Sequence, residues 1–182
     1  MSPIKNRSLK QLLWIGIGAI IMFFAGLTSA YIVRKAEGNW LEFILPDWFF
    51  YSTVTIVSSS IFLIVARSFI NKEKPINQLV LASFISGCLF SYFQFKGWQE
   101  LTMYGVFLTG EGSNVAGSFL YVITLAHLVH LLGGLIALLF ILINAIRGKY
   151  TSNNYLGFEL ASNYWHFLGL LWVYLFCFLK FF

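Results

Sequence analysis

The sequence predicts an all-α membrane protein, a bundle of five transmembrane helices that forms a single domain over residues 1–182. Three observations predict this fold class. Of the 182 residues, 59% are hydrophobic and only 10% are charged, whereas soluble domains carry roughly 25% charged residues. The apolar residues form five runs, each as long as the roughly 20 residues that a span needs. The connections between these runs are short and hold most of the charge.

The five expected spans are residues 12–33, 48–70, 78–98, 117–146 and 160–179. The first run exceeds the roughly 7–15 apolar residues of a signal peptide, so we interpret it as a retained helix. The fourth run is long enough to tilt strongly or to extend past the bilayer. Since no connection is long enough to fold independently, we expect no separate soluble catalytic domain.

The distribution of Lys and Arg predicts the orientation of the bundle. Counted on alternate sides of the membrane, eight lie on the N-terminal side and four on the other. The eight are Lys5, Arg7, Lys10, Arg67, Lys72, Lys74, Arg147 and Lys149. The positive-inside rule therefore places the N-terminus inside and the C-terminus outside. Because the basic residues form no patch, we expect no nucleic-acid partner.

Few other polar or reactive side chains lie within the apolar runs. Cys88 and Cys177 are far apart and show neither metal-ligand spacing nor a disulfide framework, so we interpret both as small buried hydrophobes. The serines of residues 58–60 and the pair Thr28-Ser29 are expected to contact neighbouring helices.

Two histidines, His127 and His130, lie one turn apart on one face of the fourth span. Haem ligation is one interpretation. Two histidines of one helix cannot take opposite axial positions of an iron, so each needs a partner, and His166 is the only other histidine. A metal site of three histidines usually has a carboxylate or Cys nearby. The alternative is hydrogen bonding across helices, which approach closely at Gly133 and Gly134.

The fifth span contains Tyr164, Trp165 and His166 and is preceded by Glu159. An imidazole within a membrane-length apolar run needs a partner or a cavity. Glu159 is expected near the inner interface, where it can cap the helix start and interact with the helix dipole. The alternative is contact with a phospholipid headgroup, for which Tyr164 and Trp165 lie at the right depth.

No self-contained active site is evident. The sequence has no nucleophile–base pair, phosphate loop, Cys-X-X-Cys motif or dinucleotide fingerprint. A transporter is disfavoured because no polar path continues through the spans. The sequence thus predicts an accessory subunit of a larger membrane complex. The alternative is a small b-type cytochrome anchor that passes electrons to quinone.

Four stretches of the chain follow the pattern of one known family. They are residues 22–26 with Ser29, Ala30 and Tyr31; Gly87, Phe90, Gln94 and Trp98; residues 117–119 with His127, His130 and Gly133; and Glu159 with residues 164–167 and Trp172. This pattern resembles subunit III of the haem-copper oxidases, the cytochrome c oxidase subunit 3 family, in its five-helix bacterial form. The last stretch is the most specific of the four.

The chain departs from this family's pattern at three carboxylates. Glutamates usual in the family fall here on Ile20 and Gly97, and an aspartate falls on Gly169. This protein therefore lacks, at these three positions, the carboxylates that the resemblance links to proton transfer or lipid binding.

The resemblance implies a non-catalytic subunit of a proton-pumping terminal oxidase of aerobic respiration, in a bacterial inner membrane. Haem and copper are expected on partner subunits, with none bound by this chain. Subunit I is the expected main contact, joined by subunit II and other oxidase subunits, and a respiratory supercomplex is a candidate larger assembly. The expected roles are phospholipid binding and support of assembly, proton uptake and durable turnover. The expected lipid contacts are Glu159, Tyr164, Trp165 and His166, and the expected helix-packing residues are His127, His130, Gly133, Gly134, Gln94 and Trp172.

Overall fold

The computed structural model describes residues 3–38, 40, 43–72, 74–110, 113–150 and 155–181. Within them lie five α-helices: α1 (Pro3–Ala36), α2 (Trp48–Asn71), α3 (Asn77–Met103), α4 (Val115–Ile146) and α5 (Leu156–Phe181). All five are long and apolar enough to cross a membrane. The predicted all-α fold with five transmembrane helices is therefore confirmed, and each helix extends the apolar run that predicted it at one or both ends.

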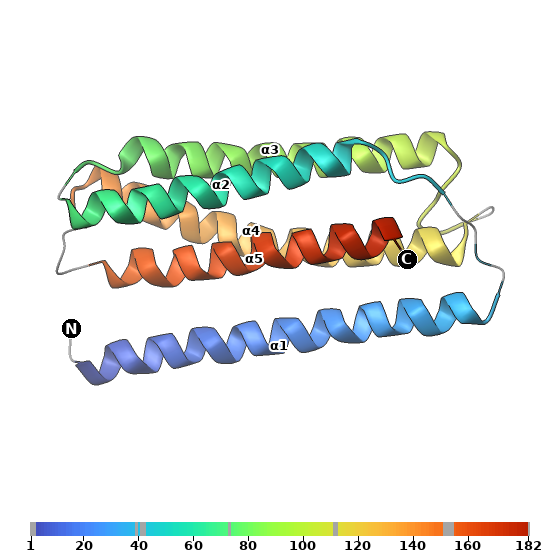
Figure 1. Cartoon of the computed structure of the whole chain (residues 1–182), viewed down its shortest axis with the longest axis horizontal. Coiled ribbons are helices and arrows are strands. Elements are labelled where there is room, and N and C mark those ends of the chain that lie inside the picture. Colours follow the sequence, from blue (N-terminus) through green and yellow to red (C-terminus); the bar gives the residue numbers. More distant parts are fainter. Residues whose placement is uncertain are drawn as a thin grey trace.

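The helices lie side by side along one common direction (Figure 1). In the described part of the chain, α5 packs against α1, α2 and α4, whereas α1 contacts α4 and α5 alone. The chain begins at one end of the bundle and α5 finishes toward the other, as an odd number of crossings requires (Figure 1). Which end faces the inside of the cell stays a prediction.

The interior divides into two clusters of buried side chains. The larger lies among α2, α3, α4 and α5, and its largest fully buried members are Phe49, Phe90, Phe158, Trp165 and Trp172. The smaller joins α1 to α4 and α5, and its buried members are Phe24, Tyr31, Ile123, Leu171, Leu175 and Phe178. The first helix is thus attached through a separate and smaller apolar contact than the one that holds the other four together.

Two glycines let the indole of Trp165 fit between helices. A Cβ at Gly87 would lie 2.6 Å from Cη2 of Trp165, and a Cβ at Gly134 would lie 3.0 Å from its Cε3 and 2.9 Å from Cδ1 of Leu168. A Cβ at Gly133 would come no closer than 3.9 Å to the hydroxyl oxygen of Tyr164. Close approach at the Gly133-Gly134 pair therefore depends on Gly134.

The prediction that both cysteines are buried is wrong. Cys88 on α3 and Cys177 on α5 are exposed on the outside of the bundle. In a membrane protein an outward side chain meets lipid or another subunit, and both surroundings favour the same small apolar residues as a core does. The apolar residues around each cysteine in the sequence therefore could not show whether its side chain faces the core or the outside of the bundle.

Candidate functional site around helix α5

A buried hydrogen-bonded network joins three helices at the middle of α5. The Nε1 of Trp165 donates to Oγ of Ser59 on α2 at 2.7 Å, and the hydroxyls of Ser59 and Ser83 on α3 lie 2.8 Å apart. All three side chains are fully enclosed or nearly so. The predicted lipid contact therefore does not extend to Trp165, whose indole is a packing and hydrogen-bonding group of the core. Ser59 contacts a neighbouring helix as predicted.

A second set of polar contacts ties α2 to α3 and α5. The Nε1 of Trp172 donates to Oγ1 of Thr53 at 2.9 Å, and Nε2 of Gln94 donates to Oγ of Ser52 at 2.8 Å. The Trp172 ring also stacks on Phe49, with centroids 6.2 Å apart and planes 16° from parallel. Gln94 and Trp172, both expected in helix packing, thus bind adjacent residues of one turn of α2.

The two histidines of α4 pack as aromatic rings. The fully buried ring of His127 lies 5.1 Å from Trp172, 5.8 Å from Phe90 and 6.3 Å from Phe24, between centroids. Within the described residues, neither ring nitrogen of His127 has a hydrogen-bond partner. The ring contacts connect α4 with α1, α3 and α5.

Within the part of the chain that the structure describes, the hydrogen bonds that we expected from these imidazoles to other helices are not found. His130 places its Nδ1 2.7 Å from the carbonyl oxygen of Ala126 on its own helix, while its ring lies 5.6 Å from that of Phe24. The physical reason is that α4 turns both rings toward aromatic side chains. A nearby hydroxyl, that of Thr53, accepts its hydrogen bond from the indole of Trp172 and not from an imidazole.

An ion pair joins the first helix to the start of the last. The Nζ of Lys10 lies 2.8 Å from Oε1 of Glu159, with the two side chains 45% and 18% exposed. Sequence reasoning missed Lys10. Both residues lie at the N-terminal ends of their helices, which places them on one side of the membrane, but nothing in the sequence indicates that α1 and α5 are neighbours.

Tyr164 and His166 are both partly exposed. The hydroxyl of Tyr164 donates to the carbonyl oxygen of His130 at 3.3 Å, and Nε2 of His166 lies 3.1 Å from Oγ of Ser162. With Glu159 paired to α1 and Trp165 bonded to α2, the predicted lipid-contact residues have partners on α1, α2, α4 and α5 itself. They lie along one helix and do not converge on a single point.

An apolar groove runs between α1 and α5 beyond these residues. Its volume is about 350 Å³. The lining residues are Ile21, Phe24, Ala25, Phe167, Leu170, Leu171 and Tyr174. At the Tyr174 end of the groove the two helices are joined again, because the Tyr174 hydroxyl donates to Oγ1 of Thr28 at 3.2 Å. This bond also shows Thr28 in the helix-contact role expected of it.

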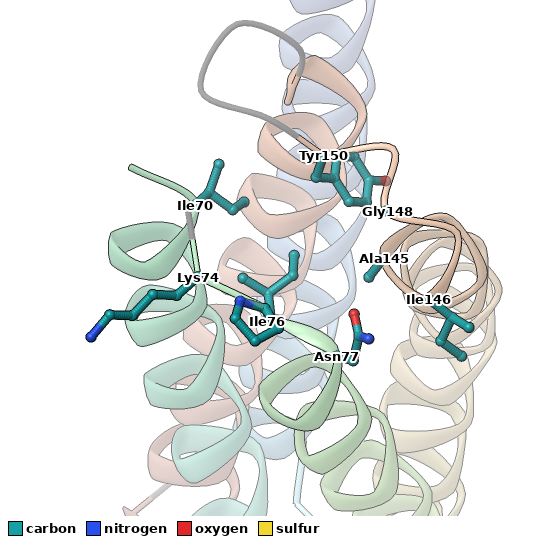
Figure 2. Close-up of a pocket in the computed structure, with 9 residues that line it drawn as sticks. Ile70, Lys74, Ile76, Asn77, Ala145, Ile146, Gly148 and Tyr150 are labelled. Atoms are coloured by element: carbon teal, nitrogen blue, oxygen red, sulfur yellow. The ribbon is translucent and has the colours of Figure 1, made fainter. Parts of the chain in front are cut away.

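A different pocket, of about 380 Å³, opens at the N-terminal end of the bundle between the α2–α3 and α4–α5 connections. Figure 2 shows the Asn77 side chain between the helices and the Lys74 ammonium pointing away. Burial raises the pKa of the Tyr150 phenol, which also borders the pocket. Among the lining residues, therefore, this pocket has an amide and a phenol but no charged group directed into it.

The three positions that lack the family's usual carboxylates are occupied by close packing. A Cβ at Gly97 would lie 2.6 Å from Cε2 of Phe49, and one at Gly169 would lie 3.2 Å from Oγ of Ser60. Ile20 packs against the smaller core cluster. At Gly97 the Phe49 ring occupies the space in which a longer side chain would begin. A glutamate side chain at position 97 would therefore clash with Phe49 in this structure.

The comparison with known proteins decides the family. The family model described as cytochrome c oxidase subunit III matches residues 46–182, which include all of α2 to α5. This chain belongs to the cytochrome c oxidase subunit III family. The resemblance found in the sequence is therefore confirmed, and it favours the oxidase subunit over the cytochrome anchor.

Named bacterial relatives extend the similarity over α1. A probable cytochrome c oxidase subunit 3 of Nocardia farcinica is 31% identical, over 93% of this chain and 84% of the relative. The cytochrome c oxidase subunit 3 of Corynebacterium diphtheriae is 26% identical, over 96% and 91% of the two chains. A probable subunit 3 of Mycobacterium tuberculosis is 30% identical over 93% and 84%. As a subunit III, this chain is a component of a cytochrome c oxidase complex and a multi-pass membrane protein.

Proposed function

We propose that this chain is the non-catalytic subunit III of a proton-pumping haem-copper oxidase in a bacterial inner membrane. It packs on subunit I and supports assembly, proton uptake and durable turnover, while haem and copper lie on partner subunits. The observation that carries the proposal is the family membership. It is supported by the use of the deep polar groups, since Trp165, Trp172 and Gln94 all bind side chains of α2.

We further propose that a phospholipid lies along the groove between α1 and α5, with an acyl chain against its apolar wall. Tyr164 precedes Phe167 and Leu171 by three and seven residues, so it shares the face of α5 that lines the groove. Glu159 and His166 precede the groove residue Leu170 by eleven and four residues, and lie near its face. These polar side chains border the groove toward the N-terminal end of the bundle.

The headgroup of this phospholipid would lie near the start of α5. There Lys10 is half exposed beside Glu159, and its long side chain can carry its ammonium out to the interface. A headgroup phosphate can bind this ammonium in addition to the Glu159 carboxylate. The groove leads away from this point into the span, which is the direction that the acyl chain of such a lipid takes.

Purification of the tagged chain in mild detergent tests the subunit proposal. Visible spectroscopy and mass spectrometry would be read on the purified material. We expect haem-containing oxidase subunits to co-purify, and the haem to stay with them when this chain is separated. Haem that stays on the isolated chain would overturn the proposal.

Native mass spectrometry of the complex tests the lipid site. Ala25→Trp fills the groove, whereas Ala19→Trp is a matched control at another exposed alanine of α1 that does not line it. We expect Ala25→Trp to lose a bound phospholipid that Ala19→Trp keeps. Equal lipid content in the two variants would contradict the proposed position.

A further inference from the structure

The end of the bundle where α1, α3 and α5 finish is hollowed on both sides of a short connecting segment, residues 43–47. On one side is a cavity of about 520 Å³, and on the other a cavity of about 320 Å³. The larger is lined by Phe43, Ile44, Leu45, Pro46, Asp47, Glu100, Leu101, Tyr104 and Val106. All of these residues lie before α2 begins, in the last turn of α3 or just after it.

Several large apolar side chains at this end of the bundle are mostly exposed. Ile44 is 89% exposed, Met103 82% and Tyr104 68%. Ile44 lies in the connection before α2, Met103 is the last residue of α3, and Tyr104 follows it. Contiguous exposed apolar surface next to a cavity is typical of an interaction site.

Two carboxylates border the larger cavity without a basic partner. Among the described residues the ion pairs are Lys10 with Glu159 and Arg34 with Glu37, so within this part of the chain neither Asp47 nor Glu100 forms an ion pair. Oε1 of Glu100 accepts a 3.1 Å hydrogen bond from the Tyr104 hydroxyl.

Both carboxylates line the larger cavity, and so does Tyr104. The pKa of the Tyr104 phenol is raised, first by its hydrogen bond to Glu100 and also by the charges of Glu100 and Asp47. No Lys or Arg lines this larger cavity, whereas Lys180 lines the smaller one together with Asp47. A cationic group is therefore attracted to the larger cavity, and an anionic group is repelled from it.

Other acidic residues lie near Asp47 and Glu100 in the sequence. Segments 37–47 and 97–114 together contain five of the seven Asp and Glu residues of the chain, and no Lys or Arg. The four Lys and Arg residues of this end, Arg34, Lys35, Lys96 and Lys180, lie outside these segments, and Arg34 pairs with Glu37. Membrane topology does not explain this concentration, because orientation depends on Lys and Arg while Asp and Glu contribute little. An acidic, apolar surface at one end of the bundle thus needs a different explanation.

We propose that this surface docks a cationic, apolar segment of another polypeptide of the oxidase complex. Its Lys or Arg side chain lies between Asp47 and Glu100, and its apolar side chains fill the cavity beside Phe43 and Ile44. The charges favour a basic polypeptide over an anionic phospholipid headgroup. The identity of the partner as an oxidase component rests on the function proposed above.

Photo-crosslinking in the intact complex tests the docking surface. A photoreactive amino acid replaces Ile44. As a control it replaces Ile85, an exposed residue within α3. We expect the probe at Ile44 to capture one identified oxidase subunit through a peptide that contains Lys or Arg, and the probe at Ile85 not to capture that peptide. The double variant Asp47→Asn with Glu100→Gln should lower the yield by roughly fivefold, as the loss of an exposed ion pair predicts.

Three results would overturn the inference: capture of phospholipid alone, capture of a second copy of this chain, or a yield that the double variant leaves unchanged. Haem spectra of every sample show first whether the complex has assembled. A chain that fails to co-purify with haem-containing subunits contradicts the proposed function. An assembled complex without the Ile44 adduct contradicts the docking surface alone.

Discussion

The indole N–H of Trp165 on α5 donates a 2.7 Å hydrogen bond to the hydroxyl of Ser59 on α2. The same hydroxyl lies 2.8 Å from that of Ser83, so one bond is extended to α3. Between helices in a membrane there is no hydrophobic driving force, since lipid is as apolar as the helix faces. Close packing and hydrogen bonds of this kind therefore carry the association of α2, α3 and α5.

The Trp165–Ser59 bond should show a measurable coupling energy. In a double-mutant cycle with Trp165→Phe and Ser59→Ala, we expect about 0.6 kcal/mol, the average for hydrogen bonds between membrane helices. Stability of the purified complex would be measured by thermal or detergent unfolding. Ser58→Ala is the control, because its exposed hydroxyl donates to the Val54 carbonyl of its own helix. A coupling no larger than that between Ser58 and Trp165 would contradict the assignment.

Gly87→Ala should destabilise the bundle. The new Cβ would lie 2.6 Å from Cη2 of Trp165 and 2.8 Å from Cδ2 of Leu135, so a rigid ring would have to move. Overpacking of this kind costs roughly 1–3 kcal/mol. Gly26→Ala is the matched control, because a Cβ there meets nothing within 4 Å. The melting temperature of the complex should fall for Gly87→Ala alone, and equal values for the two variants would refute the packing argument.

The number and type of elements could be predicted from the sequence because a membrane leaves an apolar run of this length little choice. Every backbone N–H and C=O must be satisfied within the segment, so the run becomes a helix. The helix ends were less well predicted, since a helix continues past its apolar part. The Lys10–Glu159 ion pair shows what composition cannot provide, which is the order in which the helices pack.

The direction in which individual side chains point was the second feature that the sequence did not predict. In a soluble helix the polar face marks the outside, but these helices are apolar on nearly every face. Trp165, which we expected at the lipid, is buried, and Cys88, which we expected inside, is exposed. The aromatic surroundings of His127 were equally hidden, because Phe24, Phe90 and Trp172 come from three other helices.

Exchange of the charges of Lys10 and Glu159 should preserve the docking of α1, whereas either single reversal should weaken it. Lys10→Glu or Glu159→Lys places like charges at a contact that is now 2.8 Å, and the double variant restores attraction. The effect should be at most about 1 kcal/mol, because the Lys10 side chain is half exposed and solvent screens the pair. Retention of lipid and thermal stability would be measured. Arg7→Glu, at another exposed residue of α1, is the control. Two single reversals without effect would contradict a structural role for the pair.

Replacement of His127 should leave the haem of the complex intact. His127→Leu keeps an apolar side chain between Phe90 and Trp172 and removes an imidazole that has no hydrogen-bond partner in the described part of the chain. Removal of an unpaired buried polar group costs little and can stabilise by about 1 kcal/mol.

His130→Leu differs, because it removes the contact with the Ala126 carbonyl and alters the packing on Phe24. We expect it to shorten the active lifetime of the complex. Visible spectra of both variants should match those of the unchanged oxidase. A lost haem band in either variant would instead make that histidine a ligand and would restore the cytochrome-anchor alternative.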